Sequence, residues 1–185
     1  MIFDIIKKRR SVFPVQYNDS PIAKEDIEKV LEAGNWAPNH KCTEPWRFKV
    51  IQGDAKKRLG IFLSKKYEEL DPKPKAMKVK KLQENPQMAS AIIAICMQRD
   101  PKESLPEWEE VAAVAMAVQN MWLQCTNMGI GSYWSSPGLI KYMDEFLSLN
   151  EGEKCLGFFY MGNFDGELTE GKREPIASKT EWITE

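Results

Sequence analysis

The sequence has a single histidine, His40, and this scarcity excludes several kinds of enzyme chemistry. A zinc site built on several imidazoles cannot form, and a hydrolase of the Ser-His-Asp type would have to use His40. The cysteines stand far apart and show no CxxC spacing, so neither a metal knuckle nor a thioredoxin-like pair is expected. They are Cys42, Cys96, Cys125 and Cys155. We expect buried or free thiols in a cytoplasmic protein without a metal site.

The chain also lacks an excess of charge of either sign. Its 26 Lys and Arg are balanced by 27 Asp and Glu, which gives a net charge of -1. Proteins that neutralise nucleic-acid phosphates usually carry a clear basic excess, so a nucleic-acid partner is not expected. Residues 1–11 place an apolar run before a basic cluster, the reverse of the order in a secretory signal, so export is not expected either.

Charged residues are absent from residues 111–140, although 29% of the chain is charged. An even mixture would place about nine charges there. Amide side chains interrupt residues 111–128, and lipid-exposed amides are costly, so we do not expect a membrane span. A helix that is apolar around most of its circumference is either a core helix or partly buried in an oligomer interface. We favour the interface for part of its surface, with a plain core helix as the alternative.

The spacing of apolar residues predicts an alternation of helices and strands. A short helix followed by a loop is expected within residues 1–11, with the basic residues 7–10 at the helix end. Further helices are expected over residues 23–33, 54–70, 106–128 and 136–147, and strands over residues 46–53, 89–97, 130–135 and 155–164. Gly34 stands where a helix commonly ends in a left-handed cap. The lysine-rich residues 71–87 contain prolines at 72, 74 and 86 and predict a broken helix or a mobile surface segment.

No dinucleotide fingerprint and no phosphate-binding P-loop is present, which excludes a Rossmann domain. The alternation favours a layered arrangement of helices and strands. Without an internal repeat or a linker, we expect one domain over residues 1–185, with residues 165–185 as a C-terminal arm. The arm is polar apart from Ile176, Trp182 and Ile183, which are expected to pack on another surface.

Two basic clusters stand near opposite ends of the sequence. Arg9, Arg10 and Ser11 form a compact anion-binding set, since guanidinium groups grip phosphate in bidentate fashion and a hydroxyl adds a hydrogen bond. Lys172 and Arg173 form the second cluster. The alternative for each cluster is a solvated surface patch.

Four motifs follow one another in a specific order over nearly the whole chain. They are RRS at 9–11, APNHKCTEPWRF at 37–48, GIGSYW at 129–134 and GFFYMG at 157–162. This succession resembles the nitroreductase family of FMN-dependent oxidoreductases, and in particular its short-chain branch. The resemblance implies an α+β fold of three layers with a central, mostly antiparallel sheet. It also implies a homodimer with FMN bound at the subunit interface.

The resemblance also implies which residues contact the flavin phosphate. Arg9, Arg10 and Ser11 match the segment that holds the FMN phosphate and ribityl chain. Lys172 and Arg173 resemble the basic pair that many members place on the phosphate just before the C-terminal arm.

The remaining site residues implied by the resemblance surround the flavin ring. Asn39 and His40 match a loop that approaches the flavin from the partner subunit, and Trp134, Ser135 and Ser136 match the strand end that lies along the ring. For His40, a hydrogen bond to the flavin, a place beside the substrate and a structural role all remain open. A nucleophilic pair of His40 with Cys42 has no support in the spacing.

The activity implied by the resemblance is hydride transfer from NAD(P)H through flavin N5 to a small-molecule acceptor, such as a nitroaromatic or quinone, in a ping-pong cycle. Because the cofactor carries this chemistry, a single histidine suffices. Trp36 and Ser135 stand where short-branch members often have arginine, which leaves the nucleotide and the acceptor open. The alternatives are a same-fold enzyme for reductive dehalogenation or flavin degradation, a flavin-binding protein without turnover, and a structural helical module.

Overall fold

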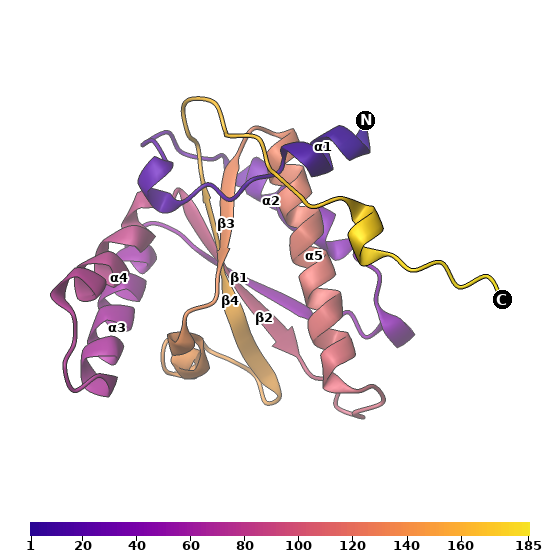
Figure 1. Cartoon of the computed structure of the whole chain (residues 1–185). Helices are drawn as coiled ribbons and strands as arrows, with labels where there is room; N and C mark the ends of the chain where they lie inside the picture. The colour runs from indigo at the N-terminus through magenta and orange to yellow at the C-terminus, as the bar shows by residue number, and fades with distance from the viewer.

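The computed structural model describes all of residues 1–185, which fold into three layers around a central sheet (Figure 1). The sheet has four strands in the order β1-β2-β4-β3, and every neighbouring pair is antiparallel. The strands are β1 (Trp46–Ile51), β2 (Ala91–Gln98), β3 (Gly131–Ser135) and β4 (Glu153–Gly162). The predicted α+β class with a central antiparallel sheet is confirmed.

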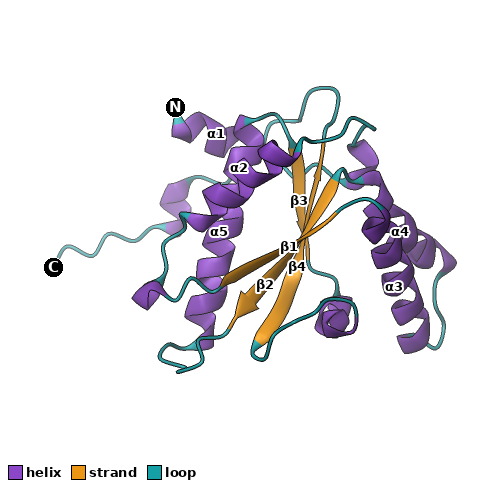
Figure 2. Cartoon of the chain, turned by 180° about the vertical axis from the view of Figure 1, so that it is seen from behind, coloured by secondary structure: helices purple, strands orange, loops and turns teal.

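Helices cover both faces of the sheet, as Figure 2 shows from behind. One layer contains α1 (Ile2–Lys8), α2 (Lys24–Asn35) and α5 (Glu107–Asn127). The other contains α3 (Asp54–Leu70), α4 (Ala76–Met88) and the 3-10 helix η3 (Gly138–Glu145). Three further 3-10 turns are η1 (Pro14–Gln16), η2 (His40–Cys42) and η4 (Ile176–Lys179).

Strand β2 lies at the centre of the molecule and is buried on both of its faces. Its alternate side chains enter two separate cores, because successive residues of a strand point to opposite faces. The side chains in the core with α2 and α5 are Ala91, Ile93, Ile95 and Met97, and those in the core with α3 are Ile92, Ala94 and Cys96. The continuous apolar run in the sequence predicted this double burial.

Helix α5 contains most of the charge-free part of the sequence, and its two sides differ. Its inner side is buried against the sheet, where Val114, Val118 and Met121 are fully enclosed. On its outer side Trp108 is 68% exposed and Met116 is 40% exposed. The helix therefore belongs to the core and also presents an uncovered apolar stripe. None of the helices combines the length and apolar character needed to cross a membrane.

Gly34 does not end α2 in a left-handed cap, so that prediction is wrong. It lies inside the helix and is buried. A Cβ atom at this position would lie only 2.9 Å from Cγ of Met121 in α5. Glycine is needed here because the two helices approach each other closely, a tertiary requirement that local cap signals do not reveal.

The prediction of a broken or mobile segment over residues 71–87 is also wrong. Most of it forms the continuous helix α4, which packs so tightly on α3 that a Cβ atom at Gly60 would collide with the carbonyl oxygen of Gln83. Pro86 lies near the end of α4 and is buried. Tertiary packing here outweighs the local preference of a lysine-rich and proline-containing segment.

One further expectation needs correction. The helix predicted over residues 136–147 is the 3-10 helix η3, with Pro137 as its N-cap residue. After β4 the chain runs past α5 and its end projects away from the body (Figure 1). Ile176, Trp182 and Ile183 are 77%, 86% and 83% exposed, so they do not pack on the body of this chain, and their packing on another surface stays a prediction.

Candidate functional site

The basic clusters from the two ends of the sequence meet beside the C-terminal part of α5. The guanidinium of Arg9 lies over the ring of Trp122, with 4.5 Å from Cζ to the ring centroid. The indole Nε1 of Trp122 donates a hydrogen bond to the carbonyl of Arg10 at 3.2 Å. Partial burial, and then the charges of Arg173 and Arg10, lower the pKa of Arg9. The three guanidinium groups therefore lie close enough for the charges of Arg173 and Arg10 to act on Arg9.

Arg10 fastens the C-terminal arm to the N-terminal segment. Its Nε donates to the carbonyl of Thr169 at 2.8 Å, and its Nη1 donates to the carbonyls of Lys7 and Arg9, both at 2.7 Å. A Cβ atom at Gly171 would lie 2.7 Å from Cζ of Arg10. The arm passes the guanidinium closely only because residue 171 has no side chain.

The arginine cluster, which we define as Arg9, Arg10 and Arg173, has no acidic partner. None of the three forms an ion pair with a carboxylate of this chain. Ser11, Lys172 and Arg173 are exposed to solvent. Converging cations without a counter-ion are the arrangement that a bound phosphate would stabilise.

The segment that follows the first arginines runs along the free edge of β3. The amide of Val12 donates to the carbonyl of Ser132 at 3.0 Å. The ring of Phe13 packs against that of Tyr133, with 4.7 Å between centroids. This segment leads from the arginine cluster toward the end of β3.

A cavity of about 130 Å³ opens where β3 ends. Two of its lining residues, Ser135 and Pro137, come from the strand end and the turn that follows it. The opposite wall comes from α4, which contributes Lys78, Lys81, Leu82 and Asn85. The sequence reasoning missed these α4 residues, although their spacing is that of one helical face.

Trp134 and Ser136 do not line this cavity. Trp134 points to the other face of the sheet, where its indole lies against Gly157 and packs on the core that includes α5. Its Nε1 is buried without a hydrogen-bond partner. Ser136 is exposed. The side chain of Trp134 is therefore a core element rather than part of the cavity wall.

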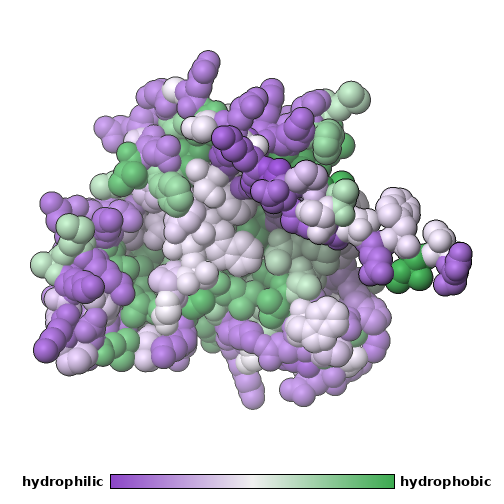
Figure 3. All heavy atoms as spheres, viewed as in Figure 1, coloured by the Kyte–Doolittle hydropathy of each residue, from purple (hydrophilic) through white to green (hydrophobic).

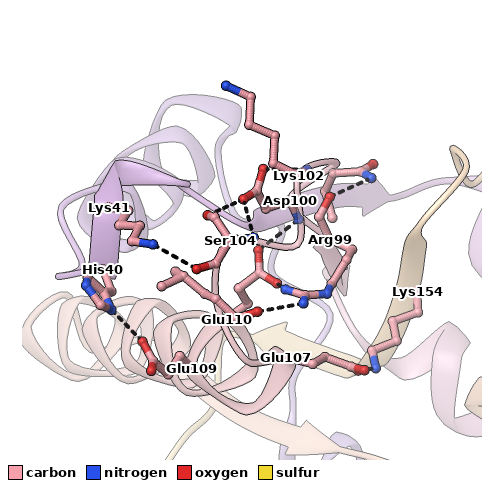
Figure 4. Close-up of polar contacts among 12 residues, drawn as sticks. His40, Lys41, Arg99, Asp100, Lys102, Ser104, Glu107, Glu109, Glu110 and Lys154 are labelled. Atoms are coloured by element: carbon pink, nitrogen blue, oxygen red, sulfur yellow. Dashed lines mark hydrogen bonds and ion pairs between the residues drawn. The ribbon is translucent and has the colours of Figure 1, made fainter.

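His40 lies at the opposite end of α5 (Figure 4), and Asn39 precedes it in the chain. The Nδ1 atom of His40 is 2.6 Å from Oε2 of Glu109, in the first turn of the helix. At a rise of 1.5 Å per residue, Glu109 and Trp122 are separated by about 20 Å along the helix axis. One chain therefore does not bring His40 to the arginine cluster.

The loop that carries His40 has a strained backbone. Lys41, Cys42 and Glu44 have positive φ angles of 54°, 52° and 42°, a region that non-glycine residues rarely adopt. Such conformations persist only where their surroundings hold them. Here the amide of Glu44 donates to Oδ1 of Asn39 at 2.9 Å, and Nζ of Lys41 donates to the carbonyl of Ser104 at 2.8 Å.

A buried carboxylate, Glu110, holds the connection that leads into α5 (Figure 4). It forms an ion pair with Arg99 and accepts a hydrogen bond from the amide of Asp100 at 2.9 Å. Arg99 in turn donates to the carbonyl of Leu105 at 2.6 Å. The surface on which the His40 loop rests is therefore tightly fixed.

The chain is similar to known proteins over most of its length. The model of the nitroreductase family matches residues 6–163. The Escherichia coli K12 protein YdjA, which has the provisional name of an NAD(P)H nitroreductase, is 29% identical over 140 residues, 75% of each chain.

Two solved structures share the fold over nearly their whole length. A nitroreductase-like family protein from Bacillus cereus is 29% identical, with a TM-score of 0.85 over 99% of this chain and 96% of that one. A nitroreductase from Bacteroides fragilis, solved with bound FMN, is 24% identical, with a TM-score of 0.73 over 100% and 98%.

Proposed function

The chain belongs to the nitroreductase family of oxidoreductases, and from this premise we propose that it binds FMN and transfers hydride from NAD(P)H to a small-molecule acceptor, such as a nitroaromatic or a quinone. The observation that carries the proposal is the convergence of Arg9, Arg10 and Arg173 without an acidic partner. Relatives support it, since YdjA is named after NAD(P)H and the Bacteroides fragilis protein holds FMN.

The residues present fit the phosphate of FMN. A phosphate dianion would relieve the mutual repulsion that, together with burial, lowers the pKa of Arg9. The exposed hydroxyl of Ser11 and the ammonium of Lys172 are further donors close by in the chain. In this proposal the cluster anchors the cofactor, and the contact of Arg10 with Thr169 keeps the arm in place beside it.

The cavity at the end of β3 fits the role of holding the ring. Ser135 and Pro137 line it, and Tyr133 gives it an aromatic wall. When bound, FMN supplies the hydride exchange at its N5 atom, so the protein needs to bind, orient and shield the reacting groups rather than provide an acid–base dyad. The backbone at Trp134 and Ser136, on either side of the cavity-lining Ser135, is proposed to contribute hydrogen bonds.

We further propose that a second copy of this chain completes the site. Asn39 and His40 lie about 20 Å along α5 from the arginine cluster of their own chain, so they would serve the flavin of the partner. Large apolar side chains left uncovered on α1, α5 and the arm support an interface between copies. They are Ile2, Phe3, Trp108, Met116, Ile176, Trp182 and Ile183. Sedimentation should then give twice the chain mass of 21.3 kDa.

The visible absorption spectrum of the purified protein tests the proposal. We expect a bound flavin that is released as FMN, that bleaches under anaerobic conditions when NADH or NADPH is added, and that recovers its colour with a quinone. A protein that carries no flavin and takes up no FMN would overturn the proposal. A bound flavin that neither nucleotide bleaches would identify a binding protein without turnover.

A further inference from the structure

Three cavities lie along α4 and share lining residues. The first is the cavity at the end of β3. The second, of about 380 Å³, shares Lys78 and Leu82 with the first and extends along η3. The third, of about 450 Å³, shares Lys81 and Asn85 with the first and extends along η1. We call the three together the α4 groove.

Positive charge predominates in the α4 groove. Its lysines are Lys78, Lys80, Lys81 and Lys141, and its only carboxylate is Glu84. Glu84 lies 3.9 Å from Lys80 in an exposed pair, which contributes little. The other three lysines form no ion pair with any carboxylate of the chain. The groove therefore holds an excess of positive charge, separate from the arginine cluster. Lys78 has a nearby carboxylate outside the groove, Asp71, whose pKa is lowered by the amide of Lys73, by Tyr67 and, to a smaller extent, by the charge of Lys78.

The walls of the groove are aromatic and apolar. The rings of Phe13 and Tyr133 pack together at its η1 end, and Phe13 is still 47% exposed. Nζ of Lys78 lies 4.1 Å from the ring centroid of Tyr67, and Met77 is 73% exposed beside it in the chain. Figure 3 shows hydrophilic side chains on the α4 side of the molecule next to a paler, more apolar area over the sheet. A flat ring with an anionic substituent matches this combination.

We propose that the α4 groove selects aromatic electron acceptors that carry a carboxylate or sulfonate over neutral acceptors of the same shape. Lys78 and Lys81 would recognise the anionic group, because they stand one helical turn apart on the face of α4 that lines the cavity at β3. This inference rests on the proposed function and specifies its acceptor. For a quinone acceptor, NAD(P)H is oxidised to NAD(P)⁺, and the quinone takes up the hydride and one proton to become a hydroquinone.

Binding of two matched probes to the oxidised, FMN-loaded protein tests the inference without turnover. We would titrate 4-nitrobenzoate and the neutral 4-nitrobenzamide and follow the flavin absorption. The benzoate should bind about fivefold to tenfold more tightly at low salt. The difference should shrink in 0.5 M salt, roughly three to four times the physiological ionic strength, because exposed charges are screened.

A pair of variants locates the effect. Changing Lys78→Gln together with Lys81→Gln should abolish the preference for the benzoate when the comparison is made on protein saturated with FMN. The matched control, Lys57→Gln with Lys65→Gln, removes the same charge from exposed positions on α3 and should retain it. The ratio of kcat/KM for the two probes should follow the ratio of their dissociation constants.

Three outcomes would overturn the groove inference: no preference in the unchanged protein, a preference that survives in the α4 variant, or an α4 variant that loses only affinity for NADPH. Failure to take up FMN would overturn the proposed function as well. A flavin that NAD(P)H bleaches, without any difference between the two probes, would overturn the groove inference alone.

Discussion

The two ends of α5 differ in whether their charged side chains have partners of opposite charge. At the N-terminal end the carboxylates are all paired, since Glu107, Glu109 and Glu110 contact Lys154, His40 and Arg99. Acidic side chains are also favoured in the first turn of a helix by its dipole. Near the C-terminal end the guanidinium groups of the arginine cluster lack any carboxylate partner. The charge-free middle of the helix separates the two.

This difference separates charges that stabilise the folded chain from charges that would be stabilised by a bound anion. A carboxylate paired within the chain, such as buried Glu110, contributes to the folded state with or without a ligand. Converging cations repel one another until an anion arrives. Changes at the two ends of α5 should therefore have different effects, on stability at the N-terminal end and on cofactor affinity at the other.

The largest effect is expected at the arginine cluster. Changing Arg9→Ala together with Arg10→Ala removes two guanidinium groups from the proposed phosphate site. Because hydrogen bonds between charged groups are worth about 1.5–3 kcal/mol each, FMN affinity should fall by roughly 100-fold or more. Fluorescence titration of the flavin-free protein with FMN measures this directly.

The control is Arg58→Ala on α3, an exposed arginine away from the cluster. It should leave FMN affinity unchanged. Circular dichroism should show a folded chain for both proteins. Unchanged flavin content in the double variant would show that the arginine cluster does not bind FMN. The proposed difference in role between the two ends of α5 would then fail.

At the N-terminal end the corresponding change should destabilise the protein. Glu110→Gln leaves Arg99 without its anionic partner in a mostly buried position. Breaking a buried pair costs up to about 3–5 kcal/mol, and the partial exposure of Arg99 places the expected loss near 2 kcal/mol. Urea unfolding measures this loss.

The FMN affinity of the remaining folded Glu110→Gln protein serves as the second readout. It should stay within about twofold of the original value, because Glu110 and the arginine cluster lie at opposite ends of α5. A variant with full stability, or one that loses FMN before it loses structure, would contradict the division of roles between the two ends.

Much of the fold could be predicted from the sequence, because the longest elements have strong periodicity. The buried run of β2 and the long apolar helix α5 are examples, and both ends of α5 were placed within a residue or two. The failures were tertiary in origin. Gly34 serves the contact with Met121, and α4 forms because it packs on α3, and neither partner is visible in a local pattern.

The basic residues that converge in the structure could be picked out from the sequence, whereas their surroundings could not. Arg9, Arg10 and Arg173 converge in the structure from opposite ends of the sequence, as a shared phosphate would require. The lysines of α4 were missed because composition assigned them to a surface segment. The place of Trp134 in the strand end along the ring stays a prediction. The alternation of β3 turns its side chain into the core, which leaves its backbone for a contact with the ring.

The smallest effect, and the sharpest test of the comparison, is expected at Glu109. Glu109 differs from Glu107 and Glu110 in its partner. The side chain of His40 is 60% exposed, and only its Nδ1 atom contacts Glu109, so Nε2 points away from the carboxylate. If His40 approaches the flavin of a second copy, then Glu109 orients a ligand-binding group as well as holding the loop. Glu109→Gln should weaken FMN binding by about threefold to fivefold while the melting temperature changes by only about 2 °C.

Glu107→Gln is the matched control, since it lies in the same helical turn and its ion pair with Lys154 involves no loop of the site. It should leave FMN affinity unchanged. If neither variant weakens FMN binding, the N-terminal end of α5 is purely structural and the contact of His40 with Glu109 has no part in the site. If only Glu109→Gln weakens FMN binding, the paired end of the helix also serves a ligand, and that ligand must lie on another copy of the chain, because its own arginine cluster is about 20 Å away.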